Sequence, residues 1–161
     1  MLFGVFLVVY GAFSVADDLA SDSSFQIALS QKNTDVYYLS AILGESIETE
    51  FLFDTGSGYL AINEVILAQL KSQKQASFKR YIHAKMANGK IRQVPLYKIV
   101  SLSLAPGCVL YDVDAAILPR NTRNILGMNV LKMMDSVSLS MDKPSLTVKG
   151  CSSTSGLVAS R

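Results

Sequence analysis

The sequence has 161 residues, 50% of them hydrophobic, and its 15 Lys and Arg against 13 Asp and Glu give a net charge of +2. This length suits one compact domain with a core of its own and is too short for two ordinary domains. Because no run of like charge marks an electrostatic surface for nucleic acid, we do not expect nucleic acid as a partner.

The N-terminal segment is uncharged and mostly apolar from residue 2 to residue 16. It is shorter than the roughly 20 residues that span a bilayer, and Ser14 and Ala16 fit the small-residue pattern of a signal peptidase site. No Lys or Arg precedes it. We expect residues 1–16 to be a signal peptide and the domain to be exported, periplasmic or extracellular. An uncleaved anchor, which would make the membrane a partner, and a buried strand are the alternatives.

The residues after this segment are expected to contain one folded domain. Residues 17–24 are small and polar, which predicts a mobile segment, residues 25–151 form the predicted domain, and residues 152–161 form a flexible tail. The only cysteines are Cys108 and Cys151, so a multi-cysteine zinc site is excluded and one disulfide is possible; two unpaired buried thiols are the alternative. No metal or other cofactor is expected.

Apolar and β-branched runs separated by turn residues predict a mainly β domain. In the run 47–53, Ile47 and Phe51 fall on one face, whereas Glu48 and Glu50 take the other. The predicted strands are 25–29, 36–43, 47–53, 81–86, 91–97, 99–104, 108–118, 136–141 and 145–149.

Helical signals are few. Asn63 can cap a helix whose apolar residues at 65, 66, 67 and 70 have helical spacing, and the polar stretch 71–80 is expected to be a solvated connection. Residues 128–134 allow one or two helical turns. The pair Asn88-Gly89 between two strand-like runs predicts a tight hairpin.

The residues with the clearest chemical meaning are Asp54 to Gly58, which follow the apolar run Phe51-Leu52-Phe53. A carboxylate at the end of a buried strand is partly desolvated, and two such groups sharing a site cannot both ionise. The ionised member can then take a proton from water while the protonated member donates to a carbonyl oxygen. Hydrolysis by this route needs no metal.

Asp54-Thr55-Gly56-Ser57 resembles the signature of aspartic peptidases, and residues 124–131, Asn-Ile-Leu-Gly-Met-Asn-Val-Leu, resemble an element near the C-terminal end of retroviral proteases. The predicted hairpin lies between them, in the position of the flap. The resemblance covers residues 25–149 and is closest to bacterial retropepsin-like proteins that carry a leader. It implies a retropepsin-like half-barrel with one or two short helices and a flap hairpin.

The resemblance implies a role for each matching residue. Asp54 would be the catalytic carboxylate, Thr55 would hydrogen-bond across a dimer axis, and Gly56 would allow close approach of the backbone. The Ser57 hydroxyl would donate to a carboxylate oxygen and favour a more acidic pH optimum. The remaining implied residues are the substrate-binding flap, Met86, Ala87, Asn88 and Gly89, and the structural element beside the active site, Ile125, Leu126 and Gly127.

Only one Asp-Thr-Gly is present, so the resemblance requires a homodimer that binds a peptide or protein substrate. The alternative function is a catalytically silent exported binding or structural module with the same fold. The other candidates have ordinary interpretations. His83 is an exposed or packed residue, Asp112 and Asp114 lie on a solvated strand face, and Met128, Met133, Met134 and Met141 serve core or dimer packing.

Overall fold

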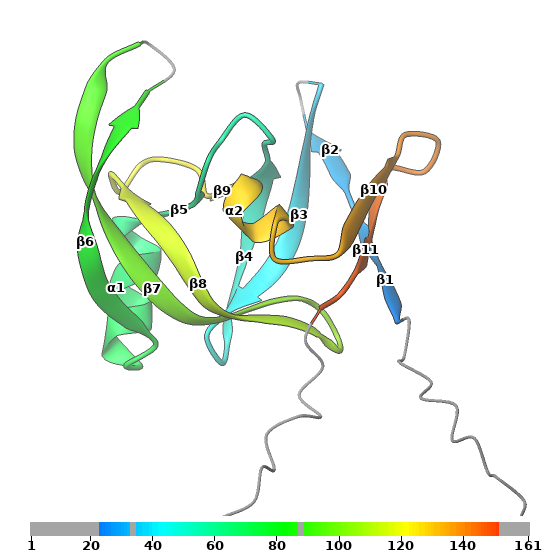
Figure 1. Ribbon diagram of the computed structural model, residues 1–161, viewed down its shortest axis with the longest axis horizontal. Helices are drawn as coiled ribbons and strands as arrows, with labels where there is room; N and C mark the ends of the chain where they lie inside the picture. The colour runs from blue at the N-terminus through cyan, green and yellow to red at the C-terminus, as the bar shows by residue number, and fades with distance from the viewer. Residues whose placement is uncertain (1–22, 33–34, 87–88, 152–161) are drawn as a thin grey trace, which may run out of the picture.

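The computed structural model describes residues 23–32, 35–86 and 89–151, and in these residues the chain forms strands and two short helices (Figure 1). The predicted mainly β class is confirmed. The predicted leader at 1–16, most of the segment 17–24 and the tail 152–161 lie outside the described residues. The elements are β1 (Ser24–Ala28), β2 (Ser30–Lys32), β3 (Val36–Leu43), β4 (Ile47–Phe53), β5 (Leu60–Asn63), α1 (Glu64–Ser72), β6 (Ala76–Lys85), β7 (Ile91–Ala105), β8 (Cys108–Leu118), β9 (Ile125–Leu126), α2 (Met128–Leu131), β10 (Ser136–Ser140) and β11 (Ser145–Lys149).

The larger sheet has eight strands in the order β2-β3-β4-β9-β5-β8-β7-β6. An additional pairing joins Ile42 of β3 to Ser103 of β7, so six of the strands close into a ring. The pairs β4–β9 and β5–β8 are parallel, whereas the β6–β7 and β7–β8 pairs are antiparallel. The closed ring surrounds the main core. β6 lies at one edge of the sheet, where among the described strands it pairs with β7 alone.

Burial on one face explains the strand patterns. In β4 the side chains of Ile47 and Phe51 are buried, whereas Glu48 and Glu50 are exposed, as the alternation predicts. The predicted helix is also confirmed, because the Asn63 side chain accepts hydrogen bonds from the N–H groups of residues 65 and 66 at the start of α1. Leu70 fixes this helix to the barrel because it is fully buried.

The region after α1 differs from the prediction. Residues 71–80 were expected to be a solvated connection, but β6 begins at Ala76 and pairs along β7 from there. The predicted strands 91–97 and 99–104 are one continuous strand, β7. The reason is that β6 lies at the sheet edge with most of its residues exposed, so its first half needs no apolar alternation to be stable in the sheet.

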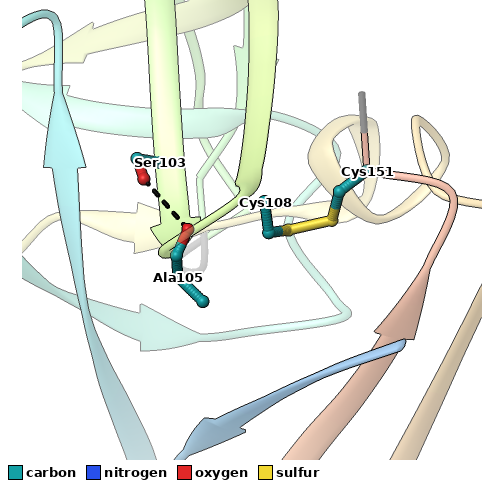
Figure 2. The surroundings of a disulfide bond; sticks show 4 residues. All are labelled: Ser103, Ala105, Cys108 and Cys151. Carbon is teal, nitrogen blue, oxygen red and sulfur yellow. Dashed lines mark hydrogen bonds between the residues drawn. A yellow bond between two sulfur atoms is a disulfide. The ribbon is translucent and has the colours of Figure 1, made fainter. Parts of the chain in front are cut away.

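A second sheet, in the order β1-β11-β10, is built from the two ends of the domain. Ser24 pairs with Lys149, so the first and last strands run side by side. A disulfide joins Cys108 at the start of β8 to Cys151 just after β11, with a Cα–Cα distance of 4.8 Å, and Figure 2 shows this link between the barrel and the small sheet. Among the described residues no helix is long and apolar enough to cross a membrane.

We expect the disulfide to contribute substantially to stability. It closes a loop of 43 residues, and chain-entropy arithmetic for such a loop gives about 4 kcal/mol at 25 °C. Urea unfolding of the Cys108→Ala/Cys151→Ala double variant, compared with the oxidised wild type, should show a loss of that order. Equal unfolding midpoints would contradict the expected contribution.

Candidate active site

Asp54 is the first residue after β4, and it is half-buried. Its N–H donates to the carbonyl of Leu126 at 3.2 Å, which continues the pairing of β4 with β9 by one residue. Its Oδ1 accepts a hydrogen bond from the Gly56 N–H at 2.8 Å, and its carbonyl accepts one from the Ser57 N–H at 3.2 Å. The loop therefore folds back on the carboxylate and orients it.

The Ser57 hydroxyl does not bond to the carboxylate. It donates to the carbonyl of Tyr59 at 2.9 Å, and a hydroxyl has a single proton to donate. The expected bond from Ser57 to a carboxylate oxygen is therefore wrong for this structure, because the loop brings a backbone acceptor closer to the hydroxyl. The expected acidic pH optimum depended on that hydrogen bond, so the structure does not support it.

The segment Ile125-Leu126-Gly127 lies directly against this loop. β9 pairs with β4 next to Asp54, and α2 starts after Gly127. A Cβ atom on Gly127 would lie 2.2 Å from the Tyr59 carbonyl oxygen and 2.8 Å from that of Ser57. This position therefore admits only glycine without a backbone shift.

The N-terminal end of α2 supports the same loop. The N–H of Met128 donates to the Ser57 carbonyl at 2.8 Å, and the N–H of Asn129 donates to the Gly58 carbonyl at 3.2 Å. Both donors are amide groups that a helix start leaves without partners inside the helix. The loop that carries Asp54 is therefore held on one side by a strand and on the other by a helix end.

Two asparagine side chains complete this support, although the sequence analysis assigned them no role. Asn129 accepts from the Leu60 N–H at 2.5 Å and donates to the Asp114 carbonyl at 2.7 Å. The buried Asn124 donates to the Thr49 hydroxyl at 3.0 Å and accepts from the Asn63 N–H at 3.1 Å. Both belong to the motif 124–131, but their partners are at least 15 residues away, beyond the reach of a local pattern.

A cleft of about 680 Å³ opens above Asp54. Its floor includes Asp54, and one wall is made by a small buried apolar cluster that contains Ile82, Val94 and Ala116, with Tyr59 packed against it. The β6–β7 hairpin, which carries Ile82 and Val94 of this wall, projects beyond the barrel (Figure 1).

Met86 and Gly89, two residues of the predicted flap, lie between the paired ends of β6 and β7. Met86 lines the cleft together with Asp54, and its N–H donates to the Lys90 carbonyl while its carbonyl accepts from the Gly89 N–H, both at 2.8 Å. Ala87 and Asn88, the other two residues of the predicted flap, lie outside the described residues.

His83, Asp112 and Asp114 were given no catalytic role in the sequence analysis. His83 is exposed and lines the cleft, so it is closer to the site than its ordinary sequence context indicated. Asp112 and Asp114 form ion pairs with Lys98 at 3.5 Å and Lys79 at 2.7 Å, which fits a solvated strand face. In the described part of the chain no three His, Cys, Asp or Glu side chains are grouped as metal ligands.

The predicted methionine cluster divides between the interior and the surface. Met134 is buried and Met128 packs against the core, whereas Met133 and Met141 are exposed.

The contact at Gly127 yields a direct test. We expect Gly127→Ala to lower the free energy of unfolding by about 3 kcal/mol, because the new methyl group must displace backbone rather than a flexible side chain. Gly58→Ala is the matched control, since a Cβ there meets nothing within 4 Å. Urea denaturation of both variants measures the difference, and equal loss in both would show that the contact is not specific.

Comparison with known proteins agrees with this fold. A solved retropepsin-like aspartic protease from Rickettsia conorii is similar in fold, with a TM-score of 0.57 and 14% sequence identity over 78% of this chain and 91% of that chain. No curated protein matches.

The family model for the gag-polyprotein putative aspartyl protease matches residues 41–133, which include β4, the Asp54 loop, the hairpin and α2. The retropepsin-like fold expected from the two motifs is thus the fold of the molecule. This chain belongs to the gag-polyprotein putative aspartyl protease family.

Proposed function

We propose that the protein is a homodimeric aspartic endopeptidase in which the Asp54 carboxylates of two copies share one site. The observation that carries the proposal is the half-buried Asp54 at the floor of a peptide-sized cleft, on a loop held by β9 and α2. The hydrogen bond from Gly56 orients the carboxylate, and the glycine-dependent contact at Gly127 fixes the loop that carries it.

The chemistry follows from two carboxyl groups at close distance, of which only one is ionised. The ionised Asp54 removes a proton from a water between the two groups, and the oxygen of that water attacks the peptide carbonyl carbon. The protonated Asp54 of the second copy donates to the carbonyl oxygen. The resulting tetrahedral intermediate breaks at the C–N bond as the Asp54 that took up the water proton donates it to the leaving amine nitrogen. The Asp54 of the second copy then regains a proton from a hydroxyl group of the intermediate, which leaves as the carboxylic acid.

The substrate binds as an extended strand. β6 is the edge strand of the large sheet and borders the cleft, so its free edge can accept main-chain hydrogen bonds from a peptide. The apolar wall at Ile82, Val94 and Ala116 then receives one side chain of that peptide. Closure of the hairpin over the bound peptide excludes water from the reaction.

A second hollow, of about 400 Å³, supports an assignment of the dimer interface. It is lined by Phe53, Thr55, Val137 and Leu139 and so adjoins the Asp54 loop on the face of Thr55. β10 is an edge strand of the small sheet, and Leu139 on it is 47% exposed. We assign this surface to the second copy, because the site needs a second carboxylate close to Thr55.

Export in the manner of bacterial retropepsin-like proteins is part of the proposal. The apolar segment 2–16 supports a cleaved signal peptide, and the Cys108–Cys151 disulfide suits an oxidising compartment. The domain would then act in the periplasm or outside the cell.

The first test removes the carboxylate. We expect Asp54→Asn to lower the rate of cleavage of a denatured protein by at least about a hundredfold, because the amide can neither accept the proton of water nor donate as an acid. Asp112→Asn is the matched control, since this residue lies outside the cleft and its positive φ of 56° suits Asn as well as Asp. Inhibition of the wild type by pepstatin, a transition-state mimic, is expected too. A folded dimer without activity would favour the silent binding module.

The second test addresses the dimer interface. We expect Leu139→Glu to give a monomer without cleavage activity, because a charge would be buried at the interface. Val100→Glu is the control, since Val100 is similarly exposed, at 45%, on β7. Sedimentation velocity and cleavage assays on the same samples measure both effects. If the Leu139→Glu variant is active and dimeric, the dimer interface lies on another surface.

A further inference from the structure

The charges of the protein are unevenly distributed along the chain. Between Glu64 and Asp112 there is no Asp or Glu, and this stretch includes the last part of α1 and all of β6 and β7. Eight of the 15 basic residues fall in it: Lys71, Lys74, Lys79, Arg80, Lys85, Lys90, Arg92 and Lys98. The hairpin that borders the cleft is therefore strongly basic.

Part of this charge is compensated from neighbouring elements. Lys79 and Lys98 are paired with Asp114 and Asp112 of β8, and the Lys71 ammonium lies 5.9 Å from the Tyr97 ring centroid. Lys85 and Arg92, by contrast, are exposed and have no salt-bridge partner within the described residues. Lys74 and Arg80 are likewise exposed and without a salt bridge there, but neither lines the cleft.

Lys85 and Arg92 differ in their relation to the substrate cleft. Lys85 lines the cleft that contains Asp54, together with His83. Arg92 lies opposite Ala84 in the β6–β7 register and lines an adjoining hollow that shares Met86 and Val94 with the cleft. The acids that line these two spaces are Asp54 and, in the adjoining hollow, Glu64.

The alternation along β6 separates two kinds of contact. Ile82 is buried and Ala84 is half-buried on the side of the apolar wall, whereas His83 and Lys85 are exposed on the other side. A peptide extended beside β6 has the same period of two. When one of its side chains faces the apolar wall, the two neighbouring side chains face the side of His83 and Lys85.

We propose that the substrate is an acidic peptide, in which the apolar residue seated against Ile82 and Val94 is flanked by Asp or Glu that face Lys85. This inference rests on the proposed peptidase function and adds its substrate class. The carboxylates of such a peptide would supply a counter-charge for Lys85, which has no salt-bridge partner among the described residues.

The size of the preference follows from the exposure of these charges. Exposed ion pairs are weak individually, so we expect a three- to tenfold higher kcat/KM, roughly, for a Glu-flanked peptide than for its Gln-flanked analogue. The advantage should shrink in 0.5 M NaCl, because salt screens charges that are exposed to solvent.

The experiment uses three peptides with the same apolar centre, flanked by Glu, Gln or Lys, at low ionic strength. Wild type should rank them Glu, Gln, Lys, Lys85→Gln should narrow the difference, and Lys85→Glu should reverse it. Lys74→Gln is the matched control, because Lys74 belongs to the same basic stretch but lies before β6, at the opposite end of that strand from Lys85. It should keep the wild-type ranking.

Binding to the Asp54→Asn protein, measured by fluorescence anisotropy, separates the two proposals. Equal binding and equal cleavage of the Glu and Gln peptides would overturn the acidic preference and leave the peptidase function standing. Wild type could cleave none of the peptides, while wild type and Asp54→Asn both bind the Glu peptide more tightly than the Gln peptide. In that case the acidic preference stands and the peptidase function fails. An unchanged ranking in Lys85→Gln and Lys85→Glu would also overturn the role of Lys85.

Discussion

The close contact between Gly127 and the carbonyl groups of Ser57 and Tyr59 is the constraint on which the site depends. It lets the start of α2 approach the Asp54 loop closely enough for two backbone N–H groups to donate to it. The same glycine follows β9, which pairs with β4 just before Asp54. The carboxylate is therefore positioned by the barrel itself rather than by a free loop, as a preorganised acid or base requires.

Much of the fold could be predicted because burial on one face leaves a readable pattern. β3 and β4 show it clearly, and Asn63 marks the start of α1. β5 and β9 escaped prediction because they have four and two residues, and pairing with distant strands defines them. The first half of β6 escaped because an exposed edge strand has a polar composition that resembles a loop.

The site was predictable where its residues are adjacent in sequence and less so where the fold assembles them. The Asp54 motif and the Gly127 element could be recognised locally, whereas the apolar wall combines residues from β6, β7 and β8. The Ser57 hydroxyl was assigned the wrong acceptor because no pattern shows the Tyr59 carbonyl beside it. The basic hairpin was overlooked for a similar reason, since its charges are spaced along the chain and become neighbours only through the pairing of β6 with β7.

The pairing of β1 with β11 has a consequence for how the domain can be attached to other structures. Because Ser24 lies opposite Lys149, the described domain begins and ends at one place on its surface. A linker, a fusion partner or a bilayer tether joined at either end would thus hold the molecule in nearly the same orientation. The architecture also suits insertion into a loop of a host protein, or circular permutation, without rearrangement of the barrel.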